Sequence, residues 1–310
     1  MVPMPPSKKK RTSILPGFGL TMGFTLLYTS LIVLIPLAAL FFKSASMSWH
    51  DIHKELTNPF LLASLKITFG FSFLAAIINV IFGFITAWTL MRYPFPGRRL
   101  LDAMIDLPFA LPTAVSGITL ATLYSRDGWL GGPWTSFSAH ANSFLTWTHL
   151  SNLLAFLHLP DAFPDQVAYS QLGILVALVF IGVPFVVRTL QPALEDLDPE
   201  VEEAAASLGA SRAQAFRRVV FPALFPALLT GFSLSFARAI GEYGSVIFIS
   251  SNKPGVSQIT AHLIMQELEG NNYAGATMLG LVMLIISFIL LISINGLQWW
   301  SSRRYKAGVT

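Results

Sequence analysis

The chain has 310 residues, of which 54% are hydrophobic and only 12% are charged, and its mean hydropathy is +0.62. Soluble domains carry about twice this share of charged residues, so the composition excludes an ordinary soluble protein and indicates an integral membrane protein. The absence of cysteine excludes disulfides, thiolate metal sites and cysteine nucleophiles. The net charge of +4 is modest, and the distribution of the charges is more informative than their sum.

Six stretches without Asp, Glu, Lys or Arg are long and apolar enough to cross a bilayer as helices, which takes about 20 residues. Helices are expected because they satisfy their backbone hydrogen bonds internally, and no stretch shows the two-residue alternation of a strand. We therefore predict an all-α membrane protein with six transmembrane helices. In chain order, the predicted spans are Gly19–Phe42, Ile67–Met91, Leu107–Ser125, Gln166–Val187, Val219–Ala237 and Gly270–Ser302.

Basic residues orient these spans, because cytoplasmic loops of membrane proteins are enriched in Lys and Arg. With the N-terminus inside, the cytoplasmic bases are Lys8, Lys9, Lys10, Arg11, Arg92, Arg98, Arg99, Arg212, Arg217, Arg218, Arg303, Arg304 and Lys306. The external loops hold far fewer, namely Lys43, Lys54, Arg126 and Lys253. This asymmetry predicts that both termini are cytoplasmic.

The two predicted cytoplasmic tails are residues 1–18 and 299–310, and the first transmembrane helix covers 19–42. A basic stretch before an apolar one is also typical of a signal peptide. This apolar stretch contains Pro36, however, and has no clear small-residue cleavage site after it. We therefore expect it to be retained as a helix.

The third predicted span contains Pro108 and Pro112, which predict a kink. The backbone at such a kink could line a transport pathway, but plain packing explains it equally well. Asp102 and Asp106 precede this span, and we expect them at the membrane interface with Arg98 or Arg99 as partners. Two further bases near span ends are expected to extend their charged groups toward water. These are Lys66 and Arg188.

Residues 126–166 form a long predicted external loop, although much of it also lacks charge. A crossing over 143–159 would move the bases at 212–218 outside and break the charge asymmetry. We predict instead a helix lying at the interface, where tryptophans favour the headgroup region. The loop tryptophans are Trp129, Trp134 and Trp147, and its histidines are His140, His149 and His158. The nine-residue spacing of these histidines puts the last two on opposite helix faces, so no metal site is predicted.

One sizeable polar segment, residues 193–222, lies between apolar stretches in the second half of the chain. Asp198 followed by Pro199 predicts a helix start, and Gly209 predicts the end of that helix. Acidic residues come early and basic ones late, which suits the helix dipoles. The helix carries an apolar stripe at helical spacing. The stripe consists of Val201, Ala204, Ala205 and Leu208.

A second short helix is predicted after this turn, because Ser211 and Gln214 have the spacing of a capping box. Pro222 is then expected to start the next span. A well-capped solvated loop is one interpretation of this helix pair, and a docking surface is another. A DNA-binding helix-turn-helix is disfavoured, since a short segment held between two spans cannot reach a groove freely, and no nucleic-acid partner is predicted.

Arg238 and Glu242 lie four residues apart on the fifth predicted span, where they can pair along one helix face. A charge inside a span is costly and is therefore a default functional candidate. A self-neutralising structural pair is one interpretation, and an arginine beside an anion path is the other. Gly241 and Gly244 flank Glu242 and permit close helix contact or a local bend.

The sequence Glu203-Ala204-Ala205 is followed by Gly209 and, nine residues after that glycine, by a segment that ends in Pro222. This pattern resembles the signature loop of binding-protein-dependent ABC importer permeases. In that family the loop inserts into a groove of the ATP-hydrolysing subunit and transmits its closure. The resemblance thus implies a set of ATPase-coupling residues. They are Glu203, Ala204, Ala205, Gly209, Val219 and Pro222.

The resemblance extends over nearly the whole chain, since Asp106–Val115, Gly182–Thr189, Phe236–Ile249 and Tyr273–Thr277 look like the sulfate/thiosulfate permease subunits. It implies a type I ABC importer permease fold in a bacterial inner membrane, with the permease domain at 60–298. It also implies transport of sulfate or thiosulfate. The Ala-Arg-Ala-x-Gly-Glu pattern is shared among oxyanion permeases, so molybdate, tungstate or another oxyanion remains the alternative cargo.

The chain contains no Gly-Lys pair and so lacks the loop that cradles nucleotide phosphates. No catalytic residue or cofactor is predicted, and the chain is not expected to be an enzyme by itself. The resemblance implies an ATP-binding subunit dimer that holds ATP and Mg²⁺, a second homologous permease subunit and a periplasmic sulfate-binding protein. Pathway candidates are Arg238, Glu242, Pro108, Pro112 and Thr113.

Two other classes of function are compatible with a multispan chain. A secondary transporter or channel predicts inverted repeats between the two halves, and none is visible in the sequence. An intramembrane enzyme needs a nucleophile and a base at matched depth, and no such pair stands out.

Overall fold

A computed structural model describes residues 17–147 and 164–307, and this part of the chain contains helices and no strand. The chain divides into two units, the first ending at Ser48 and the second running from Trp49 onward. The predicted all-α class is confirmed.

The first unit is one helical run that contains a π-helical turn. It consists of α1 (Phe18–Thr29), the turn η1 (Ser30–Leu34) and α2 (Ile35–Ala45). Pro36 lies in the first turn of α2, directly after η1. A proline within a helix removes one backbone donor, and the wider turn before it is one way to accommodate the ring. The run Phe18–Ala45 is long and apolar enough to cross a membrane, as predicted for 19–42.

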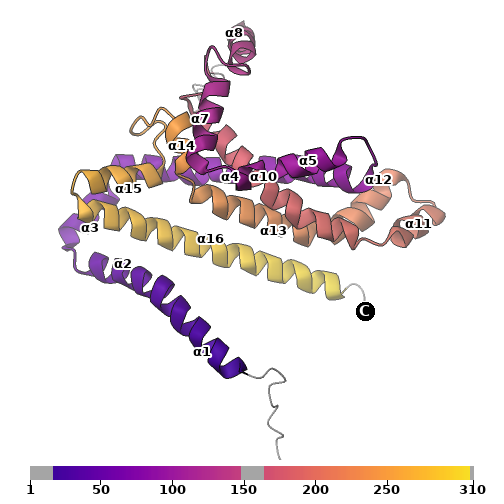
Figure 1. Ribbon diagram of the computed structural model, residues 1–310, viewed down its shortest axis with the longest axis horizontal. Helices are drawn as coiled ribbons and strands as arrows, with labels where there is room; N and C mark the ends of the chain where they lie inside the picture. Colours follow the sequence, from indigo (N-terminus) through magenta and orange to yellow (C-terminus); the bar gives the residue numbers. More distant parts are fainter. Residues whose placement is uncertain (1–16, 148–163, 308–310) are drawn as a thin grey trace, which may run out of the picture. The chain divides into compact units, whose positions relative to one another are not determined.

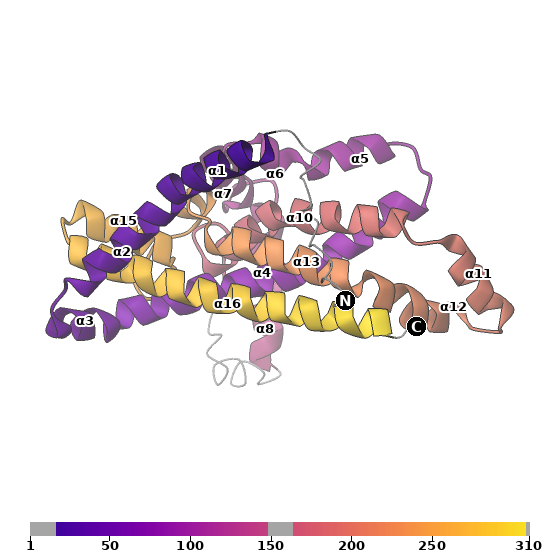
Figure 2. The same cartoon turned by 90° about the horizontal axis from the view of Figure 1, so that it is seen from below.

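Four long helices of the second unit run along a common direction, and three of them form its core (Figures 1 and 2). The four are α4 (Pro59–Arg92), α10 (Gln171–Glu195), α13 (Phe221–Ile240) and α16 (Tyr273–Ala307). Helices α4, α10 and α13 pack against one another, and α16 packs on α13. Outside the polar segment 193–222, the remaining described elements of this unit are α3 (Trp49–Leu56), α5 (Arg98–Ile105), α6 (Leu107–Ala110), α7 (Thr113–Tyr124), α8 (Gly131–Trp147), α14 (Gly244–Ile249) and α15 (Thr260–Glu269).

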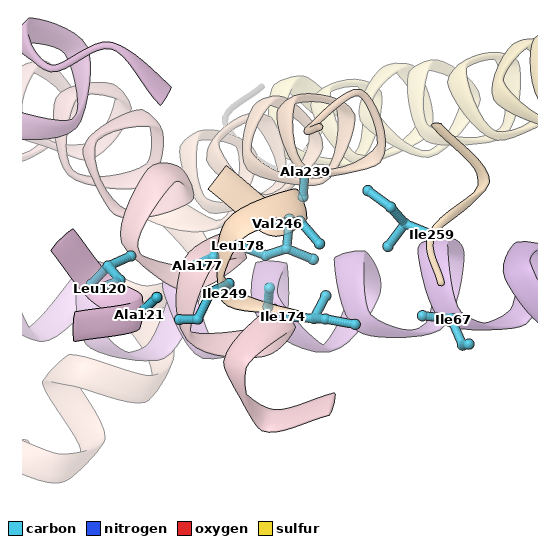
Figure 3. Close-up of a cluster of buried hydrophobic side chains, with 11 residues drawn as sticks. Ile67, Leu120, Ala121, Ile174, Ala177, Leu178, Ala239, Val246, Ile249 and Ile259 are labelled. Atoms are coloured by element: carbon cyan, nitrogen blue, oxygen red, sulfur yellow. The ribbon is translucent and has the colours of Figure 1, made fainter. Parts of the chain in front are cut away.

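A buried apolar cluster joins α10 to α7, α14 and α4 (Figure 3). Ile174 and Leu178 of α10 meet Leu120 of α7 and Val246 of α14 there. Small residues let the backbones approach closely, as at Gly117, where an added Cβ would collide with the backbone of Ser245. This packing holds α7 across the direction of the long helices.

The buried face of α4 is unusually polar for a membrane helix. It carries Ser64, Thr68, Ser72 and Asn79, all with less than a twentieth of their surface exposed. The hydroxyl of Thr68 accepts a hydrogen bond from the Thr260 backbone N–H at 2.9 Å, and the Asn79 amide donates to the Ser235 hydroxyl at 2.9 Å. Side-chain hydrogen bonds of this kind join helices where hydrophobic attraction between them is absent.

Five of the six predicted spans lie in helices long and apolar enough to cross a membrane. The third, Leu107–Ser125, is instead divided into α6 and α7 at Leu111, whose ψ of 136° is extended. Pro112 causes this break, because a proline disfavours helical geometry in the residue before it and has no N–H to donate. The predicted kink is therefore a complete interruption. The 12 residues of α7 extend about 18 Å, less than the roughly 30 Å of hydrocarbon.

The fourth predicted span, Gln166–Val187, is displaced in the structure. Helix α10 begins at Gln171, after Ser170, whose hydroxyl accepts from the Gly173 N–H, and it continues to Glu195. Arg188 consequently lies inside the helix rather than beyond its end. The predicted interfacial helix over 143–159 falls mostly on residues outside the described part of the chain, and the described helix α8 ends at Trp147.

The segments of the second unit that were predicted to be cytoplasmic gather at one end of the long helices (Figures 1 and 2). Helix α5, the polar segment and the C-terminal end of α16 lie there, whereas α3 and α15 lie at the opposite end. This agrees with the sidedness inferred from the basic residues. The six-span count and the cytoplasmic position of both termini stay predictions.

Candidate functional site

The first arm of the polar segment is α11 (Pro199–Ser207), and both of its ends are fixed by local hydrogen bonds. The Asp198 carboxylate accepts from the Glu200 backbone N–H at 2.9 Å, with Pro199 in the first turn, as predicted. Gly209 adopts a left-handed φ of +82° directly after the helix. Ala210 N–H then donates to the Ala205 carbonyl and Gly209 N–H to the Ala206 carbonyl, both at 3.0 Å, which is a Schellman closure.

The second arm begins with the predicted capping box. The Ser211 hydroxyl accepts from the Gln214 N–H at 3.3 Å, and the Gln214 side chain accepts from the Ser211 N–H at 2.8 Å. The predicted second short helix is present, and Pro222 lies in the first turn of α13 as expected, but the two helices are not separate. Helix α12 (Arg212–Ala215) passes through the π turn η2 (Phe216–Val220) into α13, so the helical run Arg212–Ile240 is continuous.

The apolar stripe of α11 faces away from the rest of the chain. Leu208 is 90% exposed and Val201 is 47% exposed, and Ala204 and Glu203 are also exposed, whereas Ala205 is half-buried. An added Cβ at Gly209 would meet nothing within 4 Å, so the glycine is required by its φ and not by contacts within this chain. The α11 stripe, meaning Val201, Ala204 and Leu208, is therefore an apolar surface without a partner among the described residues.

A cluster of aromatic and charged side chains fixes the polar segment to the end of α4. Arg92, the last residue of α4, forms an ion pair with Glu202 of α11 and lies 5.1 Å from the centre of the Trp88 ring. Trp88 and Phe84 both make edge contacts with Phe216 of η2, at 5.9 and 6.0 Å between ring centres. Both arms are thus joined to α4, and the second arm is also continuous with α13.

This anchoring cannot be predicted from local sequence patterns. Arg92 and Glu202 are 110 positions apart, and nothing near either residue specifies the other. The remaining coupling candidates lie at the base of the second arm, where Val219 is half-buried and Pro222 is exposed in the first turn of α13. Val220 beside them is fully buried in a second apolar cluster with Leu224, Val187 and other residues of α4, α10 and α13.

The pathway candidates Arg238 and Glu242 form the predicted pair, with 2.6 Å between the Arg238 Nη1 and Glu242 Oε2 atoms. Glu242 is only 3% exposed. Its other oxygen accepts from the backbone N–H and the hydroxyl of Ser245, both at 2.9 Å, at the start of α14. This carboxylate is fully engaged in holding α13 and α14 together, which favours the structural interpretation of the pair.

The other pathway candidates lie on either side of the break in the third predicted span. Thr113 is in contact distance of Gly244, where an added Cβ would collide with the threonine hydroxyl, so Thr113 lies close to the Glu242 junction. Pro112 is the residue before α7, and its carbonyl accepts from the Ser116 hydroxyl. Pro108, in the first turn of α6, instead faces an apolar hollow between α4, α5 and α10. The structure therefore does not bring all the candidates to one place.

Neither Asp102 nor Asp106 forms the expected ion pair with Arg98 or Arg99, although the charge of Arg98 helps to lower the pKa of Asp102. Both carboxylates pair with Arg188 of α10, at 2.8 and 2.6 Å, and the Gln191 amide also donates to Asp102 at 2.9 Å. The hydrogen bond from Gln191 and those from Arg188 lower the pKa of Asp102, against the opposing effect of burial. Arg188 lies inside α10, and its guanidinium is paired with these carboxylates. Lys66, within α4, is exposed.

The chain is similar in sequence to a family of membrane transport proteins. Residues 79–307 match the family described as binding-protein-dependent transport system inner membrane component. The sulfate transport system permease protein CysT of Salmonella typhimurium is 46% identical over 291 residues, covering 94% of this chain and 96% of that protein. The protein of the same name from Synechococcus elongatus is 47% identical over 280 residues, with 90% and 91% coverage.

Solved structures give the fold. A bacterial ABC transporter involved in the import of the acidic polysaccharide alginate superposes with a TM-score of 0.65 over 91% of this chain and 95% of its own, at 15% identity. A bacterial alginate ABC transporter in complex with an alginate pentasaccharide-bound periplasmic protein also gives a TM-score of 0.65, over 90% of this chain and 92% of its own, at 15% identity. This chain is therefore a multi-pass membrane protein that belongs to the family of binding-protein-dependent transport system inner membrane components.

Proposed function

We propose that the chain is the permease subunit of an ATP-driven importer for sulfate or thiosulfate, coupled to a separate ATPase through the helix pair 199–222. The observation that carries this proposal is the exposed α11 stripe on an arm anchored to the end of α4. A row of exposed apolar side chains on one helix face, which Val201, Ala204 and Leu208 form here, is typical of an interaction surface.

The shape of the two arms supports a coupling role. The small side chains Ala204 and Ala205, with the bare backbone of Gly209, allow a partner surface to approach α11 closely. The Schellman closure and the capping box make the turn between the arms rigid. A displacement imposed on α11 is therefore transmitted and not absorbed by the turn.

Two connections carry such a displacement into the membrane. The first is the Arg92–Glu202 ion pair, which joins α11 to the 34-residue helix α4. The second is the continuous helical run Arg212–Ile240, whose π turn is braced by Phe84 and Trp88. We infer that movement of the helix pair tilts α4 and α13 together and so changes which side of the membrane the pathway faces.

The energy source lies on another subunit in this proposal. The sequence has no phosphate-binding loop, so an ATPase dimer holds ATP and Mg²⁺ and this chain holds no cofactor. A second permease subunit completes the pathway, and a periplasmic sulfate-binding protein delivers the anion, by analogy with the alginate transporter that was solved with its periplasmic protein. Selectivity in the receptor agrees with the structural engagement of Arg238 and Glu242.

The names of the similar permeases favour sulfate over molybdate or tungstate as the cargo. The test is uptake of radiolabelled sulfate in a bacterial strain that lacks its own sulfate permease and expresses this chain with its partner subunits. We expect sulfate uptake that excess thiosulfate inhibits and excess molybdate leaves largely unchanged. Uptake of molybdate with no uptake of sulfate would contradict the assigned cargo but not the coupling role.

A further inference from the structure

Helix α5 (Arg98–Ile105) combines basic residues with exposed apolar ones and lies at the end of the second unit that is predicted to be cytoplasmic (Figure 2). Leu100 is 66% exposed and Met104 is 50% exposed, while Arg98 and Arg99 open the helix. A short amphipathic helix with basic residues and exposed apolar side chains is typical of a segment lying in the membrane interface. The side chains of α5 contribute to two cavities.

The first, here called the arginine cavity, has a volume of about 640 Å³ and lies between the ends of α4 and α10 and the start of α5. Three guanidinium groups line it, from Arg98, Arg99 and Arg188, together with the carboxylates of Asp102 and Glu195. Arg188 is neutralised by Asp102 and Asp106. Arg98 and Arg99 have no carboxylate within 4.0 Å among the described residues. Arg98 contacts the Met91 sulfur at 4.0 Å, and its charge also helps to lower the pKa of Asp102. The three guanidinium groups of the lining outnumber its two carboxylates, so one positive charge remains for an anionic group.

The second, here called the apolar hollow, has a volume of about 480 Å³ and shares Leu90 with the arginine cavity. Its lining includes Ile85 of α4, Met104 of α5 and Phe180 and Val183 of α10. Apolar side chains and aliphatic threonine surfaces make up nearly all of this wall. A free inorganic anion gains nothing in such a space, because it loses its hydration there.

The order of residues along α4 and α10 fixes how the two cavities are stacked. Both helices run toward the predicted cytoplasmic end, and on α10 the hollow is lined by Phe180 and Val183 and the arginine cavity by Arg188 and Gln191. The five residues from Val183 to Arg188 correspond to roughly 7 Å along the helix. The apolar hollow therefore lies deeper along these helices, and the arginine cavity lies nearer the surface.

We propose that α5 binds one anionic phospholipid, with its phosphate group in the arginine cavity and an acyl chain in the apolar hollow. The cytoplasmic leaflet carries the anionic lipids of a membrane, and basic pockets between helices on that side bind their headgroups. The phosphate group and the acyl chain of one lipid match the order of the two cavities, since the arginine cavity lies nearer the surface and the apolar hollow lies deeper. A free sulfate or phosphate ion would share the headgroup chemistry but leave the hollow without an occupant.

The test measures lipid retention by the purified full-length chain, using native mass spectrometry with phosphatidylglycerol, phosphatidylcholine or inorganic phosphate added. We expect phosphatidylglycerol to be retained in preference to phosphatidylcholine. The double change Arg98→Gln and Arg99→Gln should weaken phosphatidylglycerol binding about tenfold or more, since each base near an anionic lipid contributes measurably. Arg217→Gln with Arg218→Gln is the matched control, with two adjacent arginines at the same end but outside the cavity, and should bind normally.

A second variant separates a lipid from a free anion. Met104→Trp fills the apolar hollow while both arginines remain, and should weaken phosphatidylglycerol binding, whereas Leu100→Trp on the same helix, outside the hollow, should not. Both positions are exposed, so folding is expected to survive, and circular dichroism checks it. Equal binding by the double arginine variant and the unaltered chain would overturn the proposal. So would an unaffected Met104→Trp variant whose bound lipid is displaced by inorganic phosphate, which would indicate a free-anion site.

Discussion

At the scale of single residues, Gly209 occupies a turn whose backbone conformation favours glycine. Its φ of +82° is a left-handed conformation that costs a side-chain-bearing residue about 1 kcal/mol, and asparagine tolerates it better than most. The Cβ would touch nothing in this chain. Any defect in a substituted protein therefore comes from the turn itself or from the partner that approaches it.

Gly209→Val is expected to abolish most sulfate uptake while the chain still inserts and assembles, because the turn no longer holds the two arms at their angle. Gly209→Asn should retain much more uptake. Initial uptake rates, with membrane levels measured by immunoblotting, check this. Normal uptake by the valine variant would show that the turn is not required for coupling.

The Arg238–Glu242 pair allows its two interpretations to be separated. Arg238→Gln leaves the buried Glu242 carboxylate without its cation, a change that typically costs about 3 kcal/mol, so a lower yield of folded protein is expected. The double change with Glu242→Gln should recover that yield, since no unpaired charge remains. If the pair is structural, the recovered protein transports sulfate at close to the normal rate. A well-folded double variant that does not transport would instead place the pair in the anion path.

At the scale of elements, the caps of the polar segment were predictable and its anchoring was not. Asp198, Gly209 and the capping box at Ser211 act within a few residues, so their spacing in the sequence is sufficient. The ion pairs of Arg92 and Arg188 join residues 82 to 110 positions apart, and such pairs follow only from the packing of α4, α5 and α10. For the same reason the nearest arginines were wrongly expected to pair with Asp102.

The third predicted span shows where prediction from local composition fails. Its apolar composition suggested a full crossing, and Pro112 suggested a kink, but the sequence alone does not say that α7 packs across the long helices. Gly117 is the residue that permits this, because its missing side chain lets α7 contact the α14 backbone at Ser245. A glycine in an apolar run indicates close contact without naming the partner.

The Arg92–Glu202 pair yields a prediction at this scale. Arg92→Glu should reduce sulfate uptake while leaving ATPase binding intact, because α11 is released from α4 and its movement is no longer transmitted. Adding Glu202→Arg should restore uptake in part only, since the reversed pair loses the stacking of the guanidinium on Trp88. Uptake rates and co-purified ATPase are measured for the two single variants and the double variant. Normal uptake by all three would show that the ion pair transmits nothing.

At the scale of the whole molecule, composition and basic-residue asymmetry were enough to predict a helical multispan protein, and the structure of the second unit places the predicted cytoplasmic segments at one end. The second unit also explains why one helix pair can act on several spans. The first arm pairs with the end of α4, the second arm packs on α4 and continues into α13, and these helices share their core with α10. We therefore expect a force applied at the α11 stripe to reach the three helices that make up the core.

The central claim is that the α11 stripe is held by a separate ATPase on the cytoplasmic side. The chain has no cysteine, so Leu208→Cys introduces a single thiol, and Trp129→Cys, at a residue that is also 90% exposed but lies in the predicted external loop, is its control. With a thiol-reactive photo-crosslinker in membranes that contain the assembled transporter, we expect Leu208→Cys to be crosslinked to the ATPase subunit and Trp129→Cys not to be. Failure of Leu208→Cys to yield an ATPase adduct, with labelling of its thiol only from the exterior, would contradict the account.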